Sequence, residues 1–366
     1  MNRRAFLATT AAATAVATMK AASAETVPPF GQTGAPTPQT ALPLGPLPGA
    51  RYPDSRLESL KKPKVSFGPS GFPAFAGTMA VERVATGFRW AEGPVYFPAG
   101  RYVLFSDIPN NRIARWRRLP EGPELTTYAT GKSNGLTLDR QGQVLAAEHG
   151  GRRIARVADN GTRTVLAERY QGKRFNSPND IVVKSDGAIY FTDPPYAVQP
   201  STPGVARPEG WWRADIPGKE LAINGVYRLA PDGELRLVVE DCALPNGLAF
   251  SPDESMLYID DSAHKHIRAF DVAADGSLRN SRILLDMASS EPGVPDGMKV
   301  DSQGNVFSTG PGGLWICRPN GKLLGRVILP ELPANLAFGE DGTVIFATAR
   351  TSVYRIQTRT RGAILG

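Results

Sequence analysis

One sequence pattern recurs six times along this chain, and this repeat limits the possible folds more than any other feature. Each copy has a small polar or acidic residue, an apolar strand, a turn with Gly or Asp, a second apolar strand and a polar end. The leading residues lie 42, 45, 67, 50 and 39 positions apart and are Glu92, Asn134, Asn179, Asn246, Asp296 and Asn335. A repeat of about 45 residues built only from strands is typical of β-propeller blades.

A third apolar stretch follows most copies, as at 112–116 and 352–356, so each blade is predicted to be a meander of about four strands. The last copy ends without a fourth strand, whereas residues 79–85 alternate apolar and polar ahead of the first copy. We therefore expect an all-β, six-bladed β-propeller over residues 78–366. The N-terminal strand would complete the sixth blade and remove an open edge. The 38 Gly and 32 Pro residues also favour short strands and turns over helix bundles.

Residues 1–24 have the layout of an export signal. Arg3 and Arg4 precede a Phe-Leu pair, an apolar run rich in Ala and Thr, and an Ala-Ser-Ala sequence ending at Ala24. This arrangement resembles the twin-arginine type, so we expect contact with the export machinery for folded proteins and a periplasmic or secreted location. The run is shorter than the roughly 20 strongly apolar residues that a membrane span needs, so stable membrane insertion is not expected. Residues 25–77 carry eleven prolines and are predicted to form an extended arm.

The charge and the cysteine count narrow the range of partners. Cleavage after Ala24 would leave 39 basic and 35 acidic residues, a net charge of +4 in place of +7. The basic residues are scattered, so a nucleic-acid partner is not expected. Cys242 and Cys317 are too few for a disulfide scaffold or a thiolate metal site. A single bond between them stays open: export would permit it, but Cys317 lies in an apolar, strand-like run.

The propeller geometry gathers the six leading residues in one place. The first strand of a blade lies closest to the axis, so these residues converge on one mouth of the central channel. Their carboxylates and amides offer only oxygen ligands, which suit Ca²⁺ best, Mg²⁺ or Mn²⁺ less well, and Zn²⁺ least. Asn-Gly and Asp-Gly are also ordinary turn dipeptides. Glu92 has no such turn preference, and a buried carboxylate is costly unless a cation or a donor meets it.

Other polar side chains are expected at the same mouth, because the second strand of each meander ends there. His149 is a candidate base, or a residue that hydrogen-bonds the substrate. Asp193 and Asp261 are candidate contacts for substrate hydroxyl groups, whereas His264 and His266 are expected at the surface. The longest interval contains an insertion at about 195–224 that emerges on this face. Its aromatic residues would stack on a sugar ring or pack the insertion onto the propeller; they are Tyr196, Trp211 and Trp212.

Five motifs are specific in combination: Ala-Glu-Gly-Pro at 91–94, Asn-Ser-Pro-Asn-Asp-Ile at 176–181, Phe-Thr-Asp-Pro-Pro-Tyr at 191–196, Pro-Asn-Gly-Leu-Ala-Phe-Ser-Pro-Asp at 245–253 and Pro-Asp-Gly-Met at 295–298. From about residue 79 to 356 the chain resembles the senescence marker protein/gluconolactonase family, which includes luciferin-regenerating enzyme. The resemblance implies a propeller that hydrolyses sugar lactones with one divalent cation. It also implies that Glu92, Asn246 and Asp296 hold the cation, with Asn179 as a further ligand or substrate contact.

These observations lead to a hypothesis about the reaction. A lactone carbonyl on the cation would be polarised, and a cation-bound water would be a usable nucleophile near neutral pH. Asp296 is the first candidate to position or deprotonate that water, and His149 is the second. The predicted substrate contacts are Asn134, Asn179, Asp193, Tyr196, Trp211 and Trp212. Two alternatives stay open: a hydrolase of another lactone or a phosphotriester on the same metal site, and a non-catalytic, ligand-binding propeller.

Overall fold

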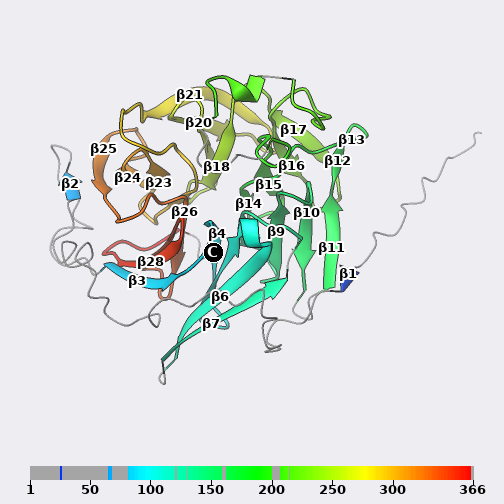
Figure 1. Ribbon diagram of the computed structural model, residues 1–366. Coiled ribbons are helices and arrows are strands. Elements are labelled where there is room, and N and C mark those ends of the chain that lie inside the picture. Colours follow the sequence, from blue (N-terminus) through cyan, green and yellow to red (C-terminus); the bar gives the residue numbers. More distant parts are fainter. Residues whose placement is uncertain are drawn as a thin grey trace, which may run out of the picture.

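The computed structural model describes residues 81–119, 122–129, 131–158, 162–199, 207–213 and 215–363, with two short strands at 25–26 and 65–67. The predicted export signal and, apart from those two strands, the predicted arm lie outside the described residues. Within the described part, six four-stranded antiparallel meanders surround a central axis, as Figure 1 shows. No α-helix occurs in that part of the chain. The prediction of an all-β, six-bladed propeller is confirmed.

The first three blades follow the chain in order. Blade 1 consists of β4 (Ala91–Phe97), β5 (Tyr102–Asp107), β6 (Arg112–Leu119) and β7 (Gly122–Ala129). Blade 2 consists of β8 (Leu136–Leu138), β9 (Val144–Glu148), β10 (Arg153–Val157) and β11 (Thr162–Ala167). Blade 3 consists of β14 (Ile181–Val183), β15 (Ile189–Thr192), β16 (Val226–Leu229) and β17 (Leu235–Val239).

The other three blades complete the circle. Blade 4 consists of β18 (Pro245–Phe250), β19 (Met256–Asp261), β20 (His266–Val272) and β21 (Leu278–Asp286). Blade 5 consists of β22 (Met298–Val300), β23 (Val306–Gly310), β24 (Gly313–Cys317) and β25 (Leu323–Val327). Blade 6 consists of β26 (Asn335–Gly339), β27 (Val344–Ala349), β28 (Ser352–Gln357) and β3 (Val81–Thr86). Since β3 pairs antiparallel with β28, the outermost strand of blade 6 comes from the N-terminal side of blade 1.

Short elements decorate this framework. The strand β1 (Glu25–Thr26) pairs with β11, and β2 (Val65–Phe67) pairs with β25, so each adds a fifth strand to an outer edge. A small hairpin is formed by β12 (Arg169–Tyr170) and β13 (Lys173–Arg174). The described ranges also contain the 3₁₀ turns η3 (Ile108–Asn110) and η4 (Trp211–Arg213). No helix within the described ranges is long and apolar enough to cross a membrane.

The hydrophobic core is divided into layers between neighbouring blades. One layer joins blades 5 and 6 through Phe307 and Phe338, and another joins blades 6 and 1 through Phe346 and Phe105. Four further clusters fill the remaining gaps between successive blades. Both faces of each sheet are therefore buried, which is why many strands are apolar throughout instead of alternating with period two. Each fully buried aliphatic or aromatic side chain contributes roughly 1.5–3 kcal/mol.

The two cysteines answer the question that the sequence left open. Cys242 and Cys317 are both buried free thiols, with no disulfide between them. Cys317 lies in β24 within the layer between blades 4 and 5, and Cys242 precedes β18. Burial raises the pKa of each thiol to about 12, so both behave as small apolar side chains.

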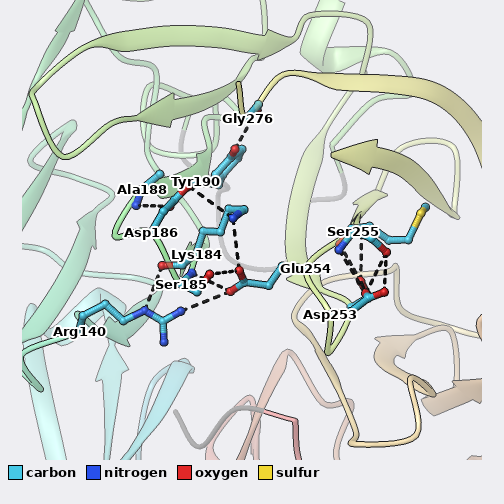
Figure 2. Close-up of polar contacts among 12 residues, drawn as sticks. Arg140, Lys184, Ser185, Asp186, Ala188, Tyr190, Asp253, Glu254, Ser255 and Gly276 are labelled. Carbon is cyan, nitrogen blue, oxygen red and sulfur yellow. Dashed lines mark hydrogen bonds and ion pairs between the residues drawn. The ribbon is translucent and has the colours of Figure 1, made fainter. Parts of the chain in front are cut away.

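A polar network ties three blades together at the end away from the leading residues. Glu254, in the turn between β18 and β19, accepts hydrogen bonds from the backbone nitrogen of Ser185, at 2.7 Å, and from its hydroxyl group. The same carboxylate pairs with Lys184 Nζ and Arg140 Nη2, each at 3.3 Å. Figure 2 shows these side chains converging from the inner turns of blades 2, 3 and 4. The inner turns are therefore held in register by one carboxylate.

Candidate active site

The first strands of the six blades contact one another in a closed ring around the axis. Glycines make the close approach possible. A methyl group on Gly93 would lie 2.0 Å from the backbone oxygen of Asn134, and one on Gly247 would lie 1.9 Å from the backbone oxygen of Asp296. Gly135 and Gly297 are packed in the same way against Asn179 and Asn335. The residues after Glu92, Asn134, Asn246 and Asp296 must therefore be glycine, so that the next blade can place its own leading residue at the mouth.

Hydrogen bonds link the leading residues of different blades. Asn134 Nδ2 donates to Asn179 Oδ1 at 2.9 Å. Thr192 Oγ1, at the end of β15, donates to the backbone oxygen of Asn246 at 2.7 Å. Asn335 Nδ2 donates to Asp180 Oδ2 at 3.4 Å. These three bonds tie blades 2, 4 and 6 to residues of blade 3 at the mouth.

Glu92 and Asn246 present buried oxygens that have no protein partner. Neither carboxylate oxygen of Glu92, which is 2% exposed, has a hydrogen-bond partner with normal geometry in the described part of the chain, although the Asn335 amide and the Gly93 N–H group lie near enough to lower its pKa. The Oδ1 atom of Asn246 is likewise buried without a partner there. Its amide nitrogen donates to Ser262 Oγ at 3.0 Å, and Ser262 Oγ donates to the backbone oxygen of Pro295 at 2.6 Å. Ser262 thus fixes the amide so that its oxygen remains available.

Asp296 stands at the more open side of the cluster and is partly exposed. Burial raises its pKa well above the ordinary value, and the charges of Glu92, Asp260 and Asp180 raise it further. The Asn246 amide acts in the opposite direction through a hydrogen bond. Several carboxylates therefore compete for ionisation in one small volume.

Two of these carboxylates were not among the predicted site residues. Asp180 lies next to Asn179, at the position that glycine occupies in four other copies, and its charge raises the pKa of Glu92, Asp260 and Asp296 alike. Asp260 is fully buried, accepts a hydrogen bond from the Gly247 nitrogen at 3.3 Å, and keeps its Oδ2 atom unpartnered among the described residues. The departure from glycine at position 180 is the sequence signal that would have found Asp180.

The donor set fits a hard divalent cation. The orphaned oxygens of Glu92 and Asn246 are buried, so leaving them without a positive or donor partner is costly. Asp296 adds a second carboxylate, and carboxylate and amide oxygens are ligands that Ca²⁺ prefers. Asn179 Oδ1 receives one hydrogen bond from Asn134, which leaves a second lone pair on that oxygen. The four residues predicted to bind a metal thus present oxygen atoms suited to that role.

His149 follows β9 and is partly exposed. Burial, and to a lesser extent the positive charge of Arg207, lower its pKa to about 4. The imidazole is therefore neutral at pH 7. Its Nδ1 atom is buried and has no partner in the described part of the chain, so it is free to donate or accept a hydrogen bond to a ligand.

Asp193 and Asp261 are engaged in holding loops. Asp193 is fully buried, and its two oxygens accept the backbone N–H groups of Asn176 and Ser177 at 2.8 and 2.7 Å. Asp261 accepts those of Ala243 and Leu244 at 2.8 and 3.1 Å. Each aspartate closes the loop that leads into the first strand of its own blade. These bonds account for both residues without a substrate.

The two remaining histidines lie beside Asp261. His264 Nδ1 is 2.9 Å from Asp261 Oδ2, and the rings of His264 and His266 stack with centroids 5.5 Å apart. One side-chain ligand atom from each of these three residues lies within 4.8 Å of the others. The side chain of His264 is 47% exposed, so it lies at the surface as predicted, whereas His266 is half-buried.

The three aromatic residues predicted to bind substrate belong to the insertion between β15 and β16, and each lies in a different environment. Trp211 is buried and packs with Ile216 and Leu244, so its main role is to seat the insertion on the rim of blade 4. Trp212 is half-buried and lines a separate cavity of 690 Å³ that also contains Lys219, Cys242 and His264. Tyr196 lies against Trp211, with ring centroids 5.6 Å apart. Its hydroxyl group interacts with Ser262 and lies within electrostatic reach of Asp296, which places Tyr196 at the mouth.

The fold and this cluster define a six-bladed β-propeller with an acidic, oxygen-lined mouth. Residues 90–351 match the family model described as SMP-30/Gluconolactonase/LRE-like region, and the chain belongs to this family.

Individual relatives agree with that assignment. The chain is 37% identical over 309 residues to a gluconolactonase of Zymomonas mobilis subsp. mobilis, covering 77% of this chain and 82% of the relative. It is 27% identical over 266 residues to the pentonolactonase XacC of Haloferax volcanii, covering 71% and 81% of the two chains. The solved structure of XC5397 from Xanthomonas campestris, described as a gluconolactonase, superposes with a TM-score of 0.71 and 33% identity, covering 86% of this chain and 98% of that one.

Proposed function

We propose that this protein is a metal-dependent lactonase that opens sugar lactones at the mouth of the propeller. The observation that carries the proposal is the convergence of Glu92, Asn246 and Asp296, two of which hold buried oxygens without a partner among the described residues. Membership of the family and the similarity to a gluconolactonase and a pentonolactonase support a lactone as the substrate.

The cation would be held by Glu92, Asn246 and Asp296, with Asn179 as the fourth protein ligand. A divalent cation bound there would polarise the lactone carbonyl group and make water a better nucleophile. Ca²⁺ is the ion that we propose, because every protein ligand is an oxygen.

The protein groups have separate tasks in this reaction. Ser262 orients the Asn246 amide, which lowers the pKa of the Asp296 carboxyl group. Asp296, partly exposed beside the substrate, would position the attacking water and accept its proton. His149 stays neutral and would hydrogen-bond the substrate or serve as an alternative proton acceptor. The proton that Asp296 accepts would then pass to the leaving ring oxygen, which becomes a hydroxyl group of the opened acid.

A titration assay tests the proposal. Hydrolysis of D-glucono-δ-lactone, followed by acid release and corrected for the spontaneous rate, should require Ca²⁺ and disappear after exhaustive chelation. Glu92→Gln and Asp296→Asn should each reduce kcat/KM by at least about a hundredfold and abolish tight Ca²⁺ binding. Glu254→Gln removes a carboxylate at the opposite end of the propeller and serves as the matched control. Full activity of either mouth variant, or of the chelated protein, would overturn the proposal.

A further inference from the structure

Arg207 reaches from the insertion towards the mouth and is held there by several contacts. Its guanidinium carbon lies 3.9 Å from the centroid of the Trp211 ring and 5.3 Å from that of Tyr196. Its Nη2 atom donates to the backbone oxygen of Gln199 at 2.7 Å. Stacking on two aromatic rings fixes the plane of a guanidinium group, so this arginine is preorganised.

Arg207 interacts with residues on two sides of the mouth. On one side, Tyr196 interacts with Ser262 and lies within electrostatic reach of Asp296. On the other side, the charge of Arg207 acts directly on His149, which follows the second strand of blade 2. Arg207 therefore stacks on Tyr196 and lies within electrostatic reach of His149.

Three buried polar atoms in this region have no partner in the described part of the chain. They are the Nε atom of Arg207, the Oε1 atom of Gln199 and the Nδ1 atom of His149. The first is a donor, the second an acceptor, and the third serves as either according to its tautomer. Burying such atoms unpaired costs free energy unless a ligand satisfies them. A ligand that offers both hydroxyl donors and hydroxyl acceptors matches this set.

We infer that Arg207, Gln199 and His149 form a subsite for the hydroxyl-bearing edge of the substrate, so that the insertion selects polyhydroxylated lactones over unsubstituted ones. This inference rests on the proposed lactonase function. Arg207 supplies a fixed donor to a ring hydroxyl oxygen, and Gln199 accepts from a neighbouring hydroxyl group. A bare lactone ring reaches the cation site equally well but leaves these groups unpaired. Polar groups left unpaired in this way are the strongest basis for rejecting an analogue.

The test compares two substrates in three proteins. D-glucono-δ-lactone carries ring hydroxyl groups, and δ-valerolactone has none. In Arg207→Gln, the ratio of kcat/KM for the hydroxylated lactone to that for δ-valerolactone should fall by about tenfold to a hundredfold, mainly through a higher KM. Arg213→Gln is the matched control. Its guanidinium group stacks 5.7 Å from the Trp212 ring in the same insertion and is exposed, so this variant should keep the wild-type ratio.

Each outcome has a distinct meaning. An equal loss on both substrates would show that Arg207 only seats the insertion, and an unchanged ratio would show that it does not contact substrate; either overturns the inference. A wild-type protein that hydrolyses neither lactone would instead refute the proposed function. A second measurement needs no turnover: NMR titration of the three histidines, assigned with His149→Gln. Removing the positive charge in Arg207→Gln should raise the pKa of His149 above its value of about 4. An unchanged His149 pKa would also overturn the inference.

Discussion

Replacing Glu92 with Gln removes a charge from the proposed cation site while keeping the size of the side chain. Glu92 is 2% exposed, and burial together with the charge of Asp180 raises its pKa to about 8. In the unfolded chain the same group titrates near its ordinary value of 4.5. At pH 7 without a cation, the folded protein therefore holds a proton that the unfolded chain releases.

The sign and size of the effect follow from that difference. A carboxyl group whose pKa is raised in the folded state lowers stability as the pH rises from 4.5 towards 8. From 4.5 to 7 the span is 2.5 pH units, and at about 1.4 kcal/mol per unit the wild type loses about 3 kcal/mol. Glu92→Gln avoids this loss. In EDTA, its stability relative to the wild type should therefore increase by about 3 kcal/mol between pH 4.5 and pH 7.

Urea denaturation followed by tryptophan fluorescence measures this difference. Saturating Ca²⁺ at pH 7 should reverse the order, because a thousandfold excess over Kd adds about 4.1 kcal/mol to the protein that binds it. Glu254→Gln should show neither the pH trend nor the reversal. A stability difference between Glu92→Gln and wild type that is the same at both pH values would refute the reasoning, as would equal stabilisation of both proteins by Ca²⁺.

Three further substitutions test other parts of the molecule, each by urea denaturation. Burial and the Arg207 charge lower the pKa of His149 to about 4, so its unfavourable protonation opposes folding as the pH falls from 6.5 to 4. His149→Gln should lose less stability than wild type over that range, and a parallel loss would contradict this. Asp193→Ala should cost about 2–5 kcal/mol, because the N–H groups of Asn176 and Ser177 lose their acceptor; a cost below about 1 kcal/mol would refute this role. Glu254→Gln should cost only about 1 kcal/mol because its ion pairs are partly exposed, and a cost above about 3 kcal/mol would show that the network is essential.

The strand framework and the mouth were predictable because each depends on a local pattern repeated six times. The leading residues of the repeat contact one another across the axis, where one strand from each blade must arrive. Asp180 and Asp260 were missed because their proximity to Glu92 depends on how inner strands from different blades meet. Arg207 was missed for a related reason: it belongs to the insertion, which has no counterpart in the other copies.

Asp193 and Asp261 lie at strand ends as predicted, and in this structure their oxygens accept backbone N–H groups of the preceding loops. Asp107 occupies the same place in blade 1 and accepts the N–H groups of Arg89 and Trp90 at 3.1 and 3.3 Å. An aspartate that ends the second strand and closes the preceding loop is therefore a structural feature of three blades. Position within the repeat alone does not separate such residues from those available for chemistry.

What separates the two groups of acids is whether the protein itself satisfies their oxygens. Every oxygen of the loop-closing aspartates Asp193 and Asp261 already accepts a backbone hydrogen bond that maintains a loop. Glu92 has no such partner in the described part of the chain, although it is equally buried. Burying the Glu92 carboxylate without a partner costs free energy of folding. A bound cation would remove this cost without breaking an existing hydrogen bond, so the cost removed would favour binding. The same reasoning applies to Arg207 and His149, where the missing partner is a hydroxyl group, and it makes unsatisfied buried atoms the most direct guide to function in this propeller.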